Sequence, residues 1–146
     1  MKIFFVQLIL LCFALLAIPV QTIEAPEWEI LVVNSHGDPV NGVTVREVFR
    51  DYSVPVQQGE HDLITSEQGK VIFPKREARI SFARRVLGVA SSIMAEGVHA
   101  SFGRHAHVFA FGKCEGDPVK NGYVEDWTGH PAHNKSTIIC RTAGEK

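Results

Sequence analysis

Histidines are the residues of this sequence best suited to chemistry, because seven occur among 146 residues and several are clustered. His105 and His107 lie two positions apart, and His99 precedes them. Alternate residues of a strand point to one face, so two imidazoles at this spacing are a workable start for a Zn²⁺ or Cu²⁺ site. We interpret residues 98–102 and 105–111 as a hairpin, and its register decides whether His99 joins the other two.

The same histidines also have a simpler interpretation. No carboxylate or cysteine lies at matching spacing, and imidazoles on the outer face of a half-buried strand need no ligand. A second pair, His130 and His133, falls in a polar loop where exposure to solvent explains it equally well. Catalysis by a histidine with Glu125 or Asp126 would need a nucleophile or a pocket that the sequence does not identify. We therefore predict no enzyme and no cofactor, with a metal site at the first cluster as the alternative.

Aromatic side chains offer a further possibility, a surface on which sugar rings stack. The candidates are Trp28, Phe102, Phe109, Phe111 and Trp127. Aromatic residues on the strands of a sandwich are more often part of the core, and we expect these to be core residues.

The first 25 residues have the composition of a secretory leader. Lys2 precedes an almost unbroken apolar run from Ile3 to Val20. Ala25 offers a small residue for cleavage, although the proline after it is unfavourable, and a cut there leaves a single domain over residues 26–146. About 18 apolar residues can also just span a bilayer, so an uncleaved N-terminal anchor is the alternative. The leader predicts a secreted or periplasmic protein.

Export changes what the three cysteines imply. Removal of Cys12 with the leader leaves Cys114 and Cys140, and an even pair in an oxidising compartment predicts a disulfide. The two cysteines are 26 positions apart. Closing a loop of this length stabilises the fold by about 3 kcal/mol in the simple chain model. Two thiols in a metal or redox site are the alternative, but a Cys-x-x-Cys spacing is missing.

The charge balance argues against one class of partner. Fifteen Lys and Arg residues are offset by sixteen Asp and Glu residues, for a formal net charge of −1. Nucleic-acid binders usually carry a basic excess or stripe, so we predict no nucleic-acid partner. An unknown protein or cell-surface component remains, and a membrane only through an uncleaved leader.

Short apolar runs separated by Gly, Pro and Asn turns predict a mainly β protein. The expected strands are 28–34, 43–52, 61–66, 71–74, 98–102, 105–111 and 136–140. From Ser81 to Glu96 the apolar positions instead recur at helical spacing, and Gly97 follows as a C-terminal cap. We expect an antiparallel, Ig-like sandwich of about seven strands with one inserted amphipathic helix, whose apolar face lies across a sheet or an open end.

The run from Leu31 to Val45 contains the turn Gly37-Asp38-Pro39-Val40-Asn41-Gly42 and is followed by Thr65 and by Gly69. This arrangement resembles the opening of carboxypeptidase regulatory-like domains, which belong to the transthyretin-like (prealbumin-like) β-sandwiches. The similarity covers roughly the first third of the mature chain. Members of that group mostly serve as accessory, adhesive or carrier modules, so the resemblance implies a non-catalytic role.

One relative in that group, hydroxyisourate hydrolase, is an enzyme with a C-terminal Tyr-Arg-Gly-Ser segment. This chain ends Cys140-Arg141-Thr142-Ala143-Gly144-Glu145-Lys146 and lacks that segment. The sequence therefore predicts an exported, non-catalytic accessory or binding module, and the alternative is an exported metal-binding protein that uses the clustered histidines.

Overall fold

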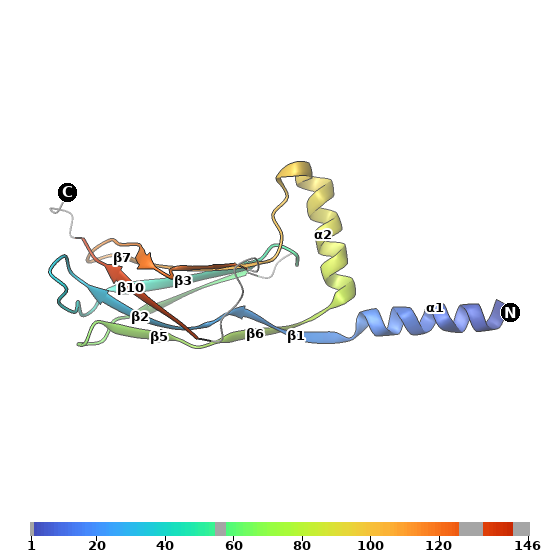
Figure 1. Cartoon of the computed structure of the whole chain (residues 1–146), viewed down its shortest axis with the longest axis horizontal. Helices are drawn as coiled ribbons and strands as arrows, with labels where there is room; N and C mark the ends of the chain where they lie inside the picture. Colours follow the sequence, from blue (N-terminus) through green and yellow to red (C-terminus); the bar gives the residue numbers. More distant parts are fainter. Residues whose placement is uncertain (1, 55–57, 126–132, 142–146) are drawn as a thin grey trace.

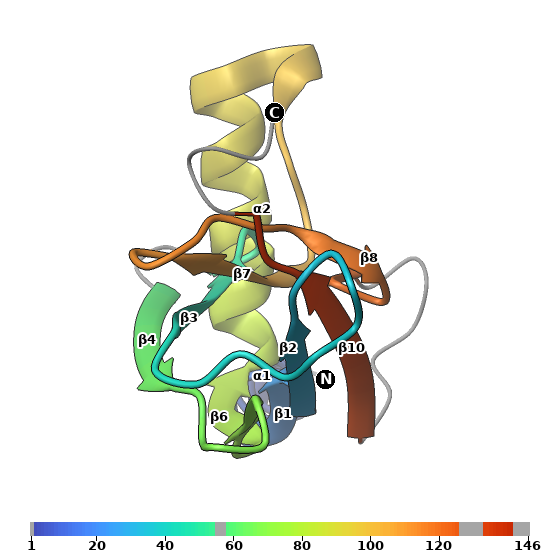
Figure 2. The ribbon, with the colours of Figure 1, turned by 90° about the vertical axis from the view of Figure 1, so that its left-hand side faces the viewer.

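The computed structural model describes residues 2–54, 58–125 and 133–141. Over these ranges the chain is mainly β, and two four-stranded sheets pack face to face (Figures 1 and 2). The elements in chain order are α1 (Lys2–Ala17), β1 (Pro19–Ala25), β2 (Glu27–Val33), β3 (Thr44–Asp51), β4 (Gln58–Ile64), β5 (Lys70–Phe73), β6 (Arg76–Ser81), α2 (Phe82–Glu96), the 3₁₀ helix η1 (Gly97–His99), β7 (Arg104–Phe111), β8 (Pro118–Lys120), β9 (Tyr123–Glu125) and β10 (His133–Ile139).

The predicted sandwich with an inserted helix is confirmed, with three differences in its strands. One sheet has the order β5-β2-β10-β8 and the other β4-β3-β7-β9, while β1 and β6 form a separate two-stranded ribbon. The described chain thus has ten strands where we expected about seven. The expected antiparallel pattern has one exception, because β10 runs parallel to β2.

The core lies between the two four-stranded sheets. Alternate residues of β2, including Trp28, Ile30 and Val32, are fully buried and face Val45 of β3 and Val108 of β7. Burial of each such side chain contributes about 1.5–3 kcal/mol relative to exposure. The alternation of β2 and β3 is therefore what fixes which face of each sheet points outward.

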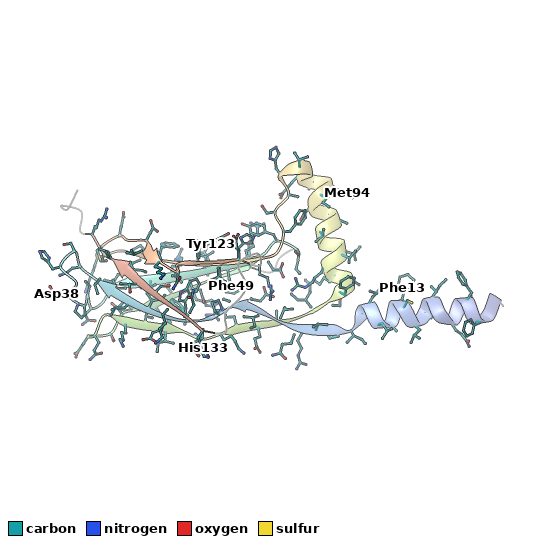
Figure 3. All side chains as sticks on the ribbon, in the orientation of Figure 1. Phe13, Asp38, Phe49, Met94, Tyr123 and His133 are labelled. Atoms are coloured by element: carbon teal, nitrogen blue, oxygen red, sulfur yellow. A yellow bond between two sulfur atoms is a disulfide. The ribbon has the colours of Figure 1, made fainter. Side chains whose placement is uncertain are left out.

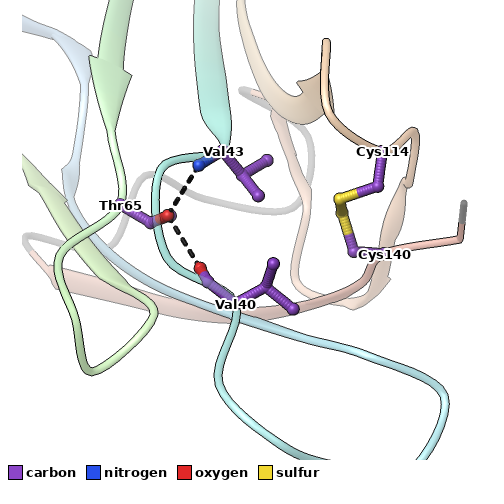
Figure 4. Close-up of a disulfide and its surroundings, with 5 residues drawn as sticks. All are labelled: Val40, Val43, Thr65, Cys114 and Cys140. Carbon is purple, nitrogen blue, oxygen red and sulfur yellow. Dashed lines mark hydrogen bonds between the residues drawn. A yellow bond between two sulfur atoms is a disulfide. The ribbon is translucent and has the colours of Figure 1, made fainter.

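The segment between β2 and β3 forms a compact turn around one threonine (Figure 4). Thr65 Oγ1 donates to the carbonyl oxygen of Val40 at 2.8 Å and accepts from the backbone N–H of Val43 at 3.0 Å. Gly42 has a φ of 72°, and a side chain at Gly69 would meet the carbonyl oxygen of Val32. The turn residues quoted from the sequence thus act together to return the chain into β3.

Cys114 and Cys140 form the predicted disulfide, with their Cα atoms 5.5 Å apart (Figure 4). Cys114 follows β7 and Cys140 follows β10, so the bond links the ends of strands that belong to different sheets. These two strands do not pair with each other, because β10 pairs with β2 and β8 and β7 pairs with β3 and β9. The disulfide therefore closes one end of the sandwich.

The predicted hairpin of 98–102 with 105–111 is wrong. Residues 97–99 form η1 at the end of α2, and β7 pairs instead with β3 over eight residues and with β9 on its other edge. Both edges of β7 are thus occupied. Val98, which we expected in a strand, is 96% exposed.

The helix predicted over 81–96 is confirmed as α2, capped by Ser81 Oγ, which accepts from the N–H of Arg84, and ended by Gly97 at a φ of 60°. The expectation that its apolar face is covered is wrong. α2 stands at one end of the sandwich and points away from it (Figure 1), and Gly88 is the buried residue among those described in this helix.

The segment that we assigned to a leader divides into two elements. α1 extends from the same end of the molecule as α2 (Figure 1), and no helix in the described part of the chain is long and apolar enough to cross a membrane. Residues 19–25 form β1, which pairs antiparallel with β6 from Pro19 opposite Ser81 to Ala25 opposite Arg76. Glu24 and Ala25 are buried, so β1 is packed against the domain.

Candidate functional site

The outer face of the sheet β4-β3-β7-β9 carries rows of side chains that antiparallel pairing aligns across the strands. Arg50 of β3 lies opposite His105 of β7, and Val48 lies opposite His107. His107 in turn lies opposite Tyr123 of β9. Residues between these positions on β7 point into the core, so β7 presents only its alternate side chains to solvent.

A cleft of about 580 Å³ opens on this face. Strands β3, β4, β7 and β9 supply its walls, together with the segment after β3, and Figure 3 shows two of its residues, Phe49 and Tyr123. The lining residues are Val48, Phe49, Arg50, Tyr52, Gln58, Gly59, Glu60, His105, His107 and Tyr123. Aromatic rings, imidazoles and both signs of charge therefore meet in one concave site.

His105 is held by contacts on both ring nitrogens. Nε2 lies 3.1 Å from the carbonyl oxygen of Phe102, which can only accept, so Nε2 carries the proton. Nδ1 is in hydrogen-bond contact with the hydroxyl of Tyr123. The Tyr52 ring packs edge-on against the imidazole, with centroids 4.9 Å apart. These three contacts hold the His105 ring in one orientation.

Burial favours the neutral form of two rings in the cleft, Tyr123 and His107. Burial raises the pKa of Tyr123 above its usual value of 10.0, and the nearby Glu125 and Tyr52 raise it further. Burial lowers the pKa of His107 below 6.5, although Asp117 and Glu60 act in the opposite direction. Because both rings are neutral, neither has to lose a charge before it contacts a ligand.

The aromatic row continues along β7 beyond the cleft. Phe109 stacks on His107 with ring centroids 5.9 Å apart, and Phe111 follows at the same spacing. The guanidinium of Arg46 lies 5.0 Å from the Phe111 ring centroid and is fixed by two hydrogen bonds to Asp62, at 2.7 and 2.8 Å. The outer face of β7 is thus lined with rings from end to end.

The expectation that the aromatic candidates are core residues is correct only for Trp28, which is fully buried. Phe109 and Phe111 belong to the outer face and are half-buried, as is Phe102 beside the cleft. Their sequence spacing, alternating with Ala106, Val108 and Ala110, was the signal that the larger side chains point outward. Trp127 lies outside the described residues.

The structure separates the three histidines proposed as metal ligands. His105 and His107 share the outer face of β7, whereas His99 lies on η1 at the far end of α2. Within the described ranges, no group of three or more His, Cys, Asp or Glu side chains is arranged to hold a metal ion. Both nitrogens of His105 are already engaged, so metal binding there would require its present contacts to break.

The remaining histidine pair does not form a described site. His133 begins β10, where its Nδ1 lies 2.9 Å from Glu27 Oε1 at the surface. His130 and Asp126 lie outside the described residues. Glu125 lies beside the cleft, with Oε2 3.9 Å from His105 Nδ1.

The structure contains three buried carboxylates that no sequence pattern indicated. Glu47 pairs with Arg76 at 2.7 Å and Asp51 lies 3.1 Å from Arg85, in both cases with the carboxylate side chain fully buried. Glu24 on β1 is also buried. Burial, reinforced by the charge of Asp51, raises its pKa from 4.5 to about 7. These groups join β1, β3, β6 and α2 behind the cleft.

Comparisons with known proteins leave the family of this chain open. No protein-family model matches the sequence, and no curated protein matches it. Among solved structures, it is similar to 3-chlorocatechol 1,2-dioxygenase from Rhodococcus opacus 1CP, with 13% identity and a TM-score of 0.44. The match covers 85% of this chain and 64% of the dioxygenase chain, which is less than two thirds of the dioxygenase's length.

Proposed function

We propose that this protein is an exported, non-catalytic β-sandwich module of the transthyretin-like group, and that its cleft binds a saccharide. The observation that carries the ligand class is the ring-lined outer face of β7, where Tyr123 and His107 flank a concave site. Sugar rings present apolar C–H faces that pack on aromatic side chains, and hydroxyl groups that need polar partners at their edges.

The polar groups around these rings suit that ligand. Arg50 and Gln58 supply donors and Glu60 supplies acceptors, and all three line the same cleft. Arg50 is placed by its contact with Tyr52, whose ring centroid lies 4.5 Å from the guanidinium carbon. A polyhydroxylated ring seated on Tyr123 would meet these groups at its rim, which is how a few polar side chains give orientation to a mainly apolar contact.

Two further observations support the other parts of the proposal. A disulfide is expected in proteins that fold in an oxidising compartment, in agreement with export. The turn built around Thr65 and the sandwich itself agree with the resemblance to carboxypeptidase regulatory-like domains. Such modules act by binding, so we expect the bound saccharide to be released unchanged.

The test is a titration of the protein with soluble glucan, xylan, chitin oligosaccharides and uronic-acid polysaccharides, followed by calorimetry. We expect one class to bind, and Tyr123→Ala and His107→Ala each to weaken that binding about tenfold through loss of ring contact. Analysis of the sugar after incubation should show no cleavage.

The matched control is Ile72→Ala on β5, because Ile72 is 57% exposed and Tyr123 is 53% exposed, but Ile72 lies on the other sheet. This variant should bind as the parent protein does. Binding of none of the saccharides, or binding that Tyr123→Ala leaves intact in a normally folded variant, would overturn the proposal.

A further inference from the structure

Helix α2 attaches to the domain through its polar side. Arg85 reaches Asp51 at 3.1 Å and donates to Thr22 Oγ1 at 3.3 Å, which ties the helix to β3 and β1. Gly88, one helical turn further along, is buried, and after another turn Ser92 Oγ donates to the carbonyl oxygen of Tyr52 at 3.5 Å. The small and charged side of the helix thus faces the sandwich.

The opposite side of α2 is apolar and exposed. Phe82, Val86 and Ile93, which helical periodicity places in one stripe, are 57%, 50% and 51% exposed, and Leu87 and Met94 beside them are 70% and 87% exposed. Figure 3 shows Met94 on the side of α2 away from the sandwich. We refer to these five residues as the α2 stripe. An amphipathic helix of a globular domain normally has the reverse orientation, with its apolar stripe toward the core.

The position of α1 indicates what covers the α2 stripe. α1 leaves the molecule at the end where α2 stands, and the two helices are in contact (Figure 1). Phe4, Leu10 and Phe13 of α1 are more than 60% exposed, and α1 is apolar on all sides. A helix of this composition is accommodated by lipid, so a bilayer that receives α1 also meets α2.

The charges beside the α2 stripe match such a surface. Arg79 on β6 and Arg84 in the first turn of α2 are exposed at the end of the helix nearest α1. The acidic residue of α2, Glu96, lies at its opposite end. Basic side chains bordering an apolar stripe are the pattern of helices that lie in the headgroup region of anionic membranes.

We propose that, in the chain that retains α1, α2 is an interfacial helix, with the α2 stripe seated in an anionic phospholipid bilayer beside α1. The cleft is lined by residues of β3, β4, β7 and β9 and by Tyr52, and the α2 stripe contributes none of its lining residues, so lipid contact at the stripe leaves the cleft open. This inference does not depend on what the cleft binds.

The test uses the full chain with α1 retained and with Cys12, the exposed free cysteine, replaced by serine. A polarity-sensitive fluorophore is placed at Ile93→Cys or, in a matched protein, at Ala95→Cys, two positions and about 200° further around the helix. Vesicles contain equal parts phosphatidylglycerol and phosphatidylcholine, with brominated acyl chains as quencher. Since α1 carries both proteins to the vesicles, the readout is the difference between the two positions.

We expect the label at position 93 to shift to shorter wavelength and to be quenched several times more strongly than the label at position 95. Arg79→Glu with Arg84→Glu should reduce that difference, and vesicles of phosphatidylcholine alone should also give a smaller one. Equal responses at the two positions would overturn the proposal. A response at position 93 that grows with protein concentration in the absence of vesicles would also overturn it, because the stripe would then bind a second copy of the chain.

Discussion

The indole Nε1 of Trp28 donates a hydrogen bond to Ser136 Oγ at 2.6 Å in the buried core, although the two residues are 108 positions apart. Ser136 Oγ then donates to the carbonyl oxygen of Asn121, also at 2.6 Å. Asn121 has a φ of 56°, in the left-handed region that few residues other than glycine adopt. These two hydrogen bonds thus give the buried indole N–H of Trp28 an acceptor and hold the turn before β9 in place.

Ser136→Ala should destabilise the fold by about 1–3 kcal/mol, because the buried indole N–H of Trp28 loses its partner. Chemical denaturation checks this value, and in a Trp127→Phe background the fluorescence reports on Trp28 alone. The control is Thr137→Ala on the exposed side of the same strand, which should change the free energy of unfolding much less. Equal effects of the two substitutions would show that the relay contributes nothing.

Replacement of both Cys114 and Cys140 by alanine should lower the free energy of unfolding by about 3 kcal/mol, since the disulfide closes a loop with a sequence separation of 26. Denaturation curves of the double variant and of the reduced parent protein measure the loss, and the two should agree. Cys12→Ser is the control, because Cys12 forms no disulfide and is exposed. A double variant as stable as the oxidised parent would contradict the role of the bond in closing the sandwich.

The elements that could be predicted from the sequence are those whose pattern is local. Alternation in β2 and β3, helical spacing with a glycine cap in α2, and an even cysteine pair each depend on a few neighbouring residues, and all three are confirmed. A local pattern does not show which strand each strand pairs with. Hence the strand expected before Gly103 does not form, and β10 has a parallel neighbour.

The cleft could not be predicted from the sequence for the same reason. His105 and His107 were identified as a pair on one face, but Arg50, Tyr52 and Tyr123 join them only through the register of β3 and β9 on β7. Tyr123 lies in a strand of three residues, too short for periodicity to be detected. Pairing of strands far apart in sequence therefore created the site from residues that are individually unremarkable.

Glu24→Gln should stabilise the protein at pH 8 and have little effect near pH 4. Burial raises the pKa of Glu24 from 4.5 to about 7, so between these values the folded state binds a proton that the unfolded state does not. The contribution of this group to stability is therefore largest below pH 4.5 and is lost as the pH rises through 7. Removing the charge should recover up to about 3 kcal/mol at pH 8.

Thermal unfolding of the Glu24→Gln variant and the parent protein across pH 4–9 measures this difference directly. The control is Glu77→Gln, because Glu77 accepts from Lys75 and Gln21 and these contacts lower its pKa. That substitution should give no gain at pH 8. A Glu24→Gln variant that is less stable than the parent at pH 8 would show that the charged carboxylate is satisfied by Arg85 and Arg104.

Residues 19–25 should be required for the stability of the domain, so a chain that begins at Pro26 should unfold more easily than one that begins at Pro19. The shorter chain loses the pairing of β1 with β6. It also loses the acceptors of two partly buried arginines, since Arg104 donates to the carbonyl oxygen of Ile23 at 2.7 Å and Arg85 to Thr22 Oγ1 at 3.3 Å.

Each lost hydrogen bond of an arginine costs about 1–3 kcal/mol, and β6 loses its pairing with β1, so we expect a loss of about 3 kcal/mol or more. Denaturation of the two chains compares their stability, and N-terminal sequencing of the exported protein locates any cleavage. Because β1 is packed against the domain, we expect a processed chain to begin at or before Pro19, and not at Pro26 as the leader composition alone suggested. An exported protein that begins at Pro26 and is as stable as the longer chain would show that β1 belongs to the leader.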